Sequence, residues 1–266
     1  MPNFAANLSF IFQEHDFLDR FEAAQRVGFK GVEFLFPYDL APPGEIAARL
    51  NDNGLTQVLF NLGQGNWEAG ERGITALPGR QDDVRRAVDN ALRYADALGC
   101  RQLHVMAGLV PEGADARAYE DTFAGNLAYV AEALGREGIR ALIEPLNTID
   151  NPGYLLSTAG QAQRVIETVG SDNLSLQYDF YHRQIMEGSL AAGFTRHRGI
   201  IAHIQVSGVP GRHEPDVGEI NYPYLFDMLD AAGYDGWIGC EYRPKDGTLE
   251  GLGWLEPYGI GTGLIT

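Results

Sequence analysis

Short apolar runs alternate with longer segments of helical periodicity along the whole chain. Apolar runs of this length are typical of strands buried in a parallel sheet, whereas apolar residues recurring every three or four positions indicate amphipathic helices. The pattern predicts eight strands, at residues 5–10, 31–34, 56–60, 102–106, 140–144, 174–178, 201–206 and 237–241. It predicts helices at residues 17–27, 45–53, 82–98, 119–137, 158–169, 184–197 and 223–232, the sixth of them only weakly patterned.

Glycine follows most of the predicted helices just before the next strand begins. Glycine adopts the left-handed backbone of a helix C-terminus without a steric penalty, so its recurrence marks repeated helix-to-strand turns. These glycines are Gly28, Gly54, Gly99, Gly138, Gly170 and Gly233. Eight strand–helix units in 266 residues average about 33 residues each, which predicts a single (β/α)8 TIM barrel domain over residues 1–266.

Charge and cysteine content narrow the class of protein. The chain has 36 acidic and 20 basic residues and a net charge of −16, which disfavours nucleic acid and anionic membrane surfaces as partners. The first residues show no signal or transit peptide pattern, and no run reaches the ~18 apolar residues needed to cross a bilayer. Only Cys100 and Cys240 are present, which fits a reducing compartment. We therefore expect a cytoplasmic protein.

Polar residues end four consecutive predicted strands. Three apolar runs finish in Glu144, Asp179 and Glu241, and a fourth places Gln205 at the equivalent position. In a parallel barrel the carboxyl ends of neighbouring strands meet at one rim, where these side chains would converge. The alternative for each acid is that it ends its strand in solvent or pairs with an arginine.

Convergence of these side chains would require a cation. Carboxylates that gather in a partly buried site repel one another strongly unless they are paired. Because all four side chains offer oxygen, a hard divalent ion, Mg2+ or Mn2+, is favoured over Zn2+. No GxGxxG segment follows a strand and no Walker sequence is present, so the sequence supports no nucleotide cofactor.

Two further side chains lie close to the predicted ligands. His182 follows Asp179 by three residues and could donate a hydrogen bond to a substrate oxygen, although a loop histidine is more often a surface residue. Arg212 follows Gln205 and could clamp a carboxylate, or could be an ordinary surface cation. His203, two residues before Gln205, is interpreted as a core histidine.

Several segments resemble the hydroxypyruvate isomerases and 2-oxo-tetronate isomerases of the xylose isomerase-like barrel superfamily. The matching segments are ANLS (6–9), GVEFLFP (31–37), EPLN (144–147), QYDFYH (177–182), HIQV (203–206), GRHEP (211–215), GEINY (218–222) and GCEYRP (239–244). The resemblance implies one divalent metal on Glu144, Asp179, Gln205 and Glu241, with proton transfer by Glu144 and Glu241. It also implies substrate contacts for His182 and Arg212.

The resemblance implies isomerisation of hydroxypyruvate to tartronate semialdehyde through a cis-enediolate. Gln205 stands where ketose 3-epimerases usually have histidine, which favours this branch. A 2-oxo-tetronate isomerase or a ketose 3-epimerase is the alternative. A metal-dependent endonuclease of the same superfamily would need more imidazole ligands and a basic groove, and a noncatalytic sugar-binding barrel would not need the four ligands. Similar enzymes form homodimers or homotetramers, and the C-terminal tail, residues 261–266, is a candidate contact.

Overall fold

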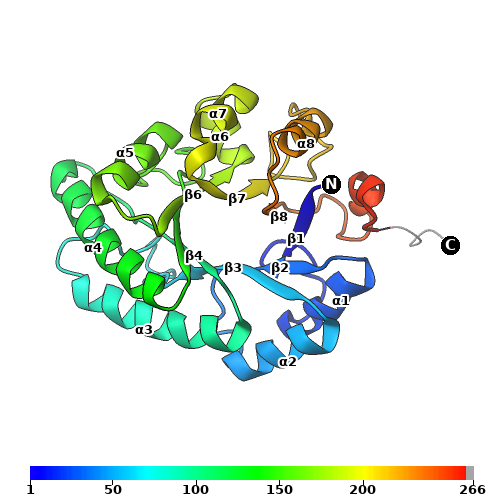
Figure 1. The fold of residues 1–266 in the computed structure, drawn as a ribbon, viewed down its shortest axis with the longest axis horizontal. Helices are drawn as coiled ribbons and strands as arrows, with labels where there is room; N and C mark the ends of the chain where they lie inside the picture. The colour runs from blue at the N-terminus through cyan, green and yellow to red at the C-terminus, as the bar shows by residue number, and fades with distance from the viewer. Residues whose placement is uncertain (262–266) are drawn as a thin grey trace. The chain divides into compact units, whose positions relative to one another are not determined.

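The computed structural model describes residues 1–261, so most of the C-terminal tail lies outside the described residues. All eight predicted strands form, and they follow one another in chain order around a closed barrel (Figure 1). This confirms the (β/α)8 prediction. The strands are β1 (Asn3–Asn7), β2 (Gly31–Glu33), β3 (Thr56–Leu62), β4 (Gln102–Val105), β5 (Arg140–Ile143), β6 (Leu174–Asp179), β7 (Ile201–Val206) and β8 (Trp237–Cys240).

Helices connect the strands, and two differ from the prediction. They are α1 (Arg20–Arg26), α2 (Pro43–Asn53), α3 (Gln81–Leu98), α4 (Ala116–Arg136), α5 (Ala159–Val169), α6 (Phe180–Met186), α7 (Leu190–His197) and α8 (Tyr222–Ala231), with short 3-10 helices η1 (Phe17–Asp19), η2 (Arg198–Ile200) and η3 (Leu252–Tyr258). The weakly patterned helix predicted at 184–197 is two helices, because Gly188 and Ser189 have φ of 60° and 47°. The helix η3 was not predicted.

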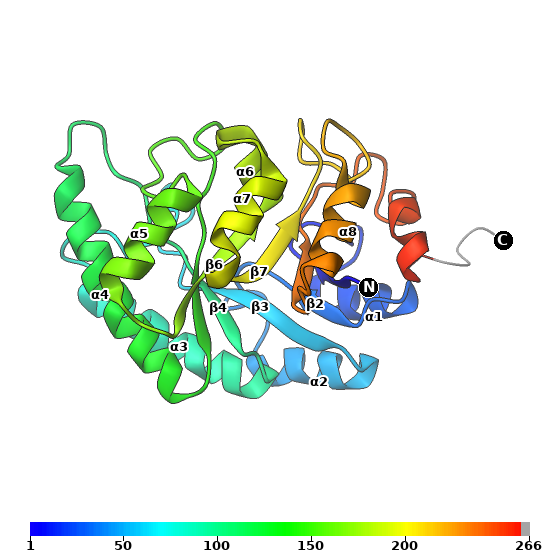
Figure 2. The ribbon, with the colours of Figure 1, turned by 45° about the horizontal axis from the view of Figure 1, so that its top comes forward.

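Residues 59–202 form one compact unit. Within it β4 pairs with β3 and β5, and β5 pairs with β6, all parallel. The helices of this unit lie outside its strands in both views (Figures 1 and 2). The amphipathic pattern explains this packing, since α3 buries one face at three- and four-residue spacing. That face consists of Val84, Val88, Ala91, Tyr94, Ala95 and Leu98.

Residues 1–58 and 203–261 form the second unit. Here β1 pairs with β2 and β8, and β7 pairs with β8 so that Gln205 lies opposite Gly239. Phe226 of α8 stacks on Trp254 of η3 and meets the edge of Phe4 from β1. These aromatic contacts hold η3 against the strands and the helix of this unit.

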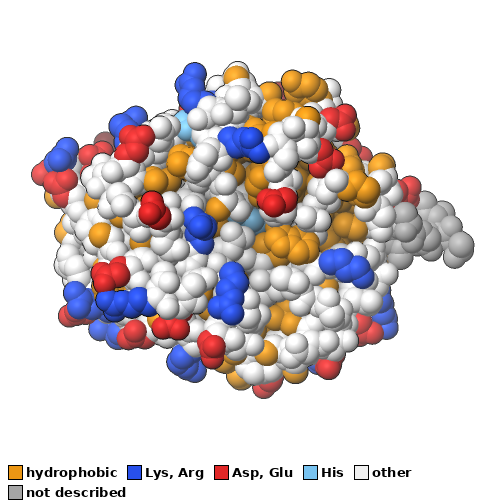
Figure 3. Space-filling view, in the orientation of Figure 1, with side chains coloured by type: hydrophobic (Ala, Val, Ile, Leu, Met, Phe, Trp, Pro, Cys, Tyr) orange, Lys and Arg blue, Asp and Glu red, His pale blue; other side chains and the backbone are white. Residues whose placement is uncertain are grey.

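The thiols are enclosed, and charges of both signs are mixed on one face of the surface. Both cysteines are buried and free. Among residues 1–261 no helix is long and apolar enough to cross a membrane. On the face drawn in Figure 3, acidic and basic side chains are interspersed, with no basic stripe of the kind that a nucleic acid backbone requires.

A hydrogen-bonded carboxylate joins the β1–α1 connection to the segment after β8. Glu14 accepts hydrogen bonds from the backbone N–H of Thr248 at 2.7 Å and from its hydroxyl at 3.0 Å. The Thr248 hydroxyl in turn accepts from the backbone N–H of Phe12 at 2.7 Å. Partial burial opposes ionisation of Glu14, but the bonds from Thr248 outweigh it and lower the pKa of the carboxyl.

Glu14→Gln is expected to lower the free energy of unfolding at pH 7 by less than about 1 kcal/mol, because the carboxyl is partly exposed. Because the folded pKa is depressed, the stabilisation that Glu14 contributes is fully present above the ordinary pKa of 4.5. It is lost as the pH falls through the folded pKa. Urea unfolding of both proteins at pH 7 and in acid checks this. A stability difference that does not shrink in acid contradicts it.

Candidate active site

Asp179 occupies the junction between β6 and α6. It is the last residue of the strand and also the N-cap of the helix, since its Oδ1 accepts the backbone N–H of Tyr181 at 2.8 Å. The cap holds the carboxylate in one orientation, and its other oxygen, Oδ2, faces His182. The side chain is buried, so the alternative that it simply ends its strand in solvent does not hold for Asp179.

Glu144 follows β5 directly and precedes Pro145, which keeps the glutamate extended. It is 5% exposed. Its Oε2 accepts from Gln177 Nε2 at 2.9 Å and lies 3.6 Å from His104 Nδ1. Gln177 is two residues before Asp179 and shares its strand face, so β6 supplies both the Asp179 carboxylate and a side chain that orients Glu144.

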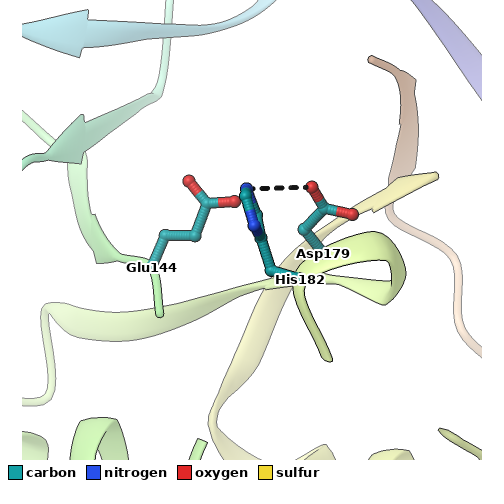
Figure 4. A group of neighbouring side chains, drawn as sticks. All are labelled: Glu144, Asp179 and His182. Atoms are coloured by element: carbon teal, nitrogen blue, oxygen red, sulfur yellow. Dashed lines mark ion pairs between the residues drawn. The ribbon is translucent and has the colours of Figure 1, made fainter. Parts of the chain in front are cut away.

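His182 lies in α6 and is 3% exposed, which corrects its prediction as a loop residue. One ligand atom from each of Glu144, Asp179 and His182 falls within 4.8 Å of the others. Figure 4 shows the three side chains converging, with His182 Nε2 3.6 Å from Asp179 Oδ2. The residues 59–202 therefore bring together two predicted metal ligands and one predicted substrate contact.

The hydrogen bonds of His182 decide its role in this cluster. Its Nδ1 lies 3.0 Å from the backbone N–H of Asn147 and 2.7 Å from the Asn147 side-chain nitrogen. A backbone N–H can only donate, so Nδ1 carries no proton and the neutral ring is protonated on Nε2. A metal needs an unprotonated nitrogen. His182 thus presents a donor to the cluster, and the two carboxylates are the candidate metal ligands.

The tautomer of His182 is directly measurable. Long-range 1H–15N NMR correlation spectra are expected to show the proton on Nε2 near neutral pH, and to keep it there when Mg2+ is added. His213, whose Nδ1 bonds to the Arg243 carbonyl, carries its proton on Nδ1 and provides the internal reference of opposite tautomer. A proton on Nδ1 of His182 would contradict the assignment.

Glu241 and Arg212 form a close pair in the unit of residues 1–58 and 203–261. Glu241 is buried directly after β8 and accepts from an Arg212 guanidinium nitrogen at 2.6 Å. Arg212 also lies over the ring of Phe10, 4.8 Å from its centre. Glu241 therefore has the arginine partner that was considered for each acid. A substrate carboxylate that binds Arg212 would share the guanidinium with this glutamate.

Gln205 belongs to a buried network in the same unit. Its side-chain nitrogen donates to Glu33 Oε1 at 2.8 Å, and His203 Nε2 lies 2.7 Å from Glu33 Oε2. The core interpretation of His203 is confirmed, since the ring is completely buried. Asn7 contacts both Glu33 and Glu241. The four predicted ligands are thus divided between the units, two in each.

Sequence reasoning gave no role to Glu33, Gln177 and Asn147. Glu33 ends the apolar run of β2 just as the predicted ligands end theirs, and Gln177 follows the strand period from Asp179, so both carried a usable signal. Asn147 carried none, because its contact with His182 arises from the folding of a loop.

Comparisons with known proteins agree with the barrel fold. The family model of the xylose isomerase-like TIM barrel matches residues 21–258. A 2-oxo-tetronate isomerase of Cupriavidus necator is 55% identical over 97% of this chain and 99% of its own, and a hydroxypyruvate isomerase of Escherichia coli is 46% identical over 97% and 100%. A crystal structure from Brucella melitensis, described as an AP endonuclease of family 2, is 50% identical with a TM-score of 0.95, covering 97% and 99%.

The chain therefore belongs to the xylose isomerase-like TIM barrel family. Within that family it falls among the hydroxypyruvate and 2-oxo-tetronate isomerases, which are isomerases of the aldose–ketose type.

The residues present fit a hard divalent ion. Glu144 and Asp179 place carboxylate oxygens close together, and the histidine beside them is a donor rather than a ligand. Oxygen-rich sites of this kind suit Mg2+ and Mn2+, whereas structural Zn2+ sites are usually built from thiolate and imidazole.

Proposed function

We propose that this protein is a divalent-metal-dependent isomerase of small 2-oxo acids that carry a hydroxyl on C3, with Glu144, Asp179, Gln205 and Glu241 as the metal ligands. The observation that carries the proposal is the buried cluster of Glu144 and Asp179 beside the Nε2–H of His182. The carboxyl ends of consecutive strands share one rim in a parallel barrel, which supports adding Gln205 and Glu241 to the same ion.

The chain's own residues would move one proton between neighbouring carbons. A divalent ion held by these four side chains would supply Lewis-acid stabilisation of the negative charge that develops on the substrate oxygens. Of Glu144 and Glu241, one removes the proton from C3 and the other returns it at C2. His182 donates its Nε2–H to a substrate oxygen, and Arg212 binds the substrate carboxylate. No redox cofactor is required, because the hydrogen leaves and returns as a proton.

Two substrates share this chemistry and differ by one carbon. Hydroxypyruvate would give tartronate semialdehyde, which is the reaction expected from the sequence. The three relatives at 47–55% identity are named 2-oxo-tetronate isomerases, which favours the four-carbon acid as the better substrate. Measuring kcat/KM for both acids, with product identification by NMR in deuterated water, decides between them. Failure to isomerise either acid in the presence of Mg2+ or Mn2+ would overturn the proposal.

A DNA-directed activity is the second candidate, because the Brucella melitensis structure is described as an endonuclease. The net charge of −16 opposes it, since binding to a phosphate backbone depends on lysine and arginine contacts. Incubation with a duplex containing one abasic site separates the two functions. We expect neither a gel shift nor a nick at enzyme concentrations that turn over the oxo acids.

A further inference from the structure

Glu33 is the most enclosed carboxylate that the proposed reaction does not use. It ends β2 and is 0% exposed. A Cβ atom added to Gly239 on β8 would lie 2.2 Å from Glu33 Oε1, so the absence of a side chain at 239 leaves the space that the carboxylate fills. An ionised group buried this deeply needs a hydrogen-bond donor for each oxygen.

Two strands supply those donors. Gln205 Nε2 from β7 and Asn7 Nδ2 from β1 donate to Oε1 at 2.8 and 3.0 Å. His203 Nε2, also from β7, lies 2.7 Å from Oε2 and is completely buried. Because both oxygens are engaged from different sides, the carboxylate cannot turn without breaking one of these bonds.

This geometry determines which end of the Gln205 amide faces Glu33. The two ends of an amide are nearly the same size, so only its partners select the orientation. Gln205 Nε2 donates to Glu33 Oε1, so the NH2 group of the amide faces Glu33 and its Oε1 points away from it. A hard divalent ion binds the amide oxygen and not the NH2 group.

We propose that Glu33 is a positioning residue that presents the oxygen of Gln205, rather than its nitrogen, to the metal. The proposal rests on the proposed function, since it assigns Gln205 as a ligand. Asn7 extends the same control, because its Nδ2 also lies 3.4 Å from Glu241 Oε1, while its Oδ1 accepts the backbone N–H of Ser9. The buried Glu33 carboxylate thus orients two amides, that of Gln205 and that of Asn7 beside Glu241.

A double-variant cycle tests the proposal through Mn2+ affinity, measured by electron paramagnetic resonance on proteins shown to be folded by circular dichroism. Glu33→Gln removes the acceptor-only partner, and Gln205→Glu sets two carboxylates against each other. Each is expected to weaken Mn2+ binding by about 10- to 100-fold. The variant carrying both changes has a carboxylate at 205 that accepts from the new amide at 33, and its affinity is expected to return to within about threefold of wild type.

The outcomes are distinct. Gln205→Glu with Mn2+ affinity equal to or tighter than wild type would overturn the proposal, as would a double variant in which the two losses simply multiply. If Glu33→Gln does not fold, Gln205→Glu decides alone. Glu14→Gln, which removes a hydrogen-bonded carboxylate bound to Thr248, is the matched control and should leave Mn2+ affinity unchanged. A wild-type protein that binds no Mn2+ refutes the proposed function itself, whereas binding and turnover with an additive cycle refute only the role of Glu33.

Discussion

Glu144→Gln is expected to lower kcat for 2-oxo acid isomerisation by about 10²- to 10⁴-fold while the protein stays folded. The substitution keeps the shape of the side chain but removes the basicity needed to take or return a proton. In the wild-type protein Gln177 Nε2 donates to Glu144 Oε2. The substitution also replaces a carboxylate oxygen near Gln177 by an NH2 group. The fold should survive because the volume of the buried side chain is unchanged.

The measurement is steady-state turnover together with exchange of the substrate C3 hydrogen into deuterated water. Loss of exchange would identify Glu144 as the first base, and retained exchange without product would assign that role to Glu241. Glu132→Gln is the control, because Glu132 is exposed on α4 and pairs with Arg136 on the same helix. Turnover of Glu144→Gln near the wild-type rate would rule out the proposed chemistry.

Removal of divalent metal is expected to abolish activity without unfolding the chain. Glu144 and Asp179 are both buried, and an ion between their carboxylates would relieve their repulsion. Chelation followed by dialysis should therefore leave inactive protein that Mg2+ or Mn2+ restores. Returning the ion at about 100 times its Kd should also stabilise the folded state by about 2.7 kcal/mol, seen as a higher Tm.

Metal analysis of the purified protein provides the control for this experiment. One equivalent of divalent ion per chain is expected for wild type, and much less for Asp179→Asn, which keeps the N-cap oxygen bonded to Tyr181 but weakens the ligand. Full activity in chelated, metal-free protein would contradict the proposal.

The local pattern of the sequence predicted the strands and the residues that end them, because strand period and helix-ending glycines act over a few positions. All six of those glycines have φ between 60° and 108°. The break between α6 and α7 was missed, since Ser189 adopts a left-handed backbone that its residue type does not favour. The helix η3 was missed because its packing depends on Phe4 and Phe226, which are distant in sequence.

The site was predicted less completely than the fold. Glu144, Asp179 and His182 could be grouped from sequence, because two lie at the ends of adjacent strands and the third is one helical turn away. The contacts that orient them join residues far apart in the chain: Gln205 is 172 positions from Glu33. No periodicity in a single sequence records such a pairing. The helical position of His182 was hidden for a different reason, since Asp179 is both a strand end and a helix cap.

Gly239 is the position at which the network around Glu33 leaves no room for a side chain. Glycine inside a strand weakens it, since the residue has no side chain to pack and loses more conformational freedom on folding than any other. Yet a Cβ atom at this position would overlap the Glu33 carboxylate. Saturation mutagenesis of the strand interior should therefore find that position 239 does not tolerate even alanine, a substitution that ordinarily stabilises a strand. At this position the stability of the strand and the room for a buried carboxylate compete directly.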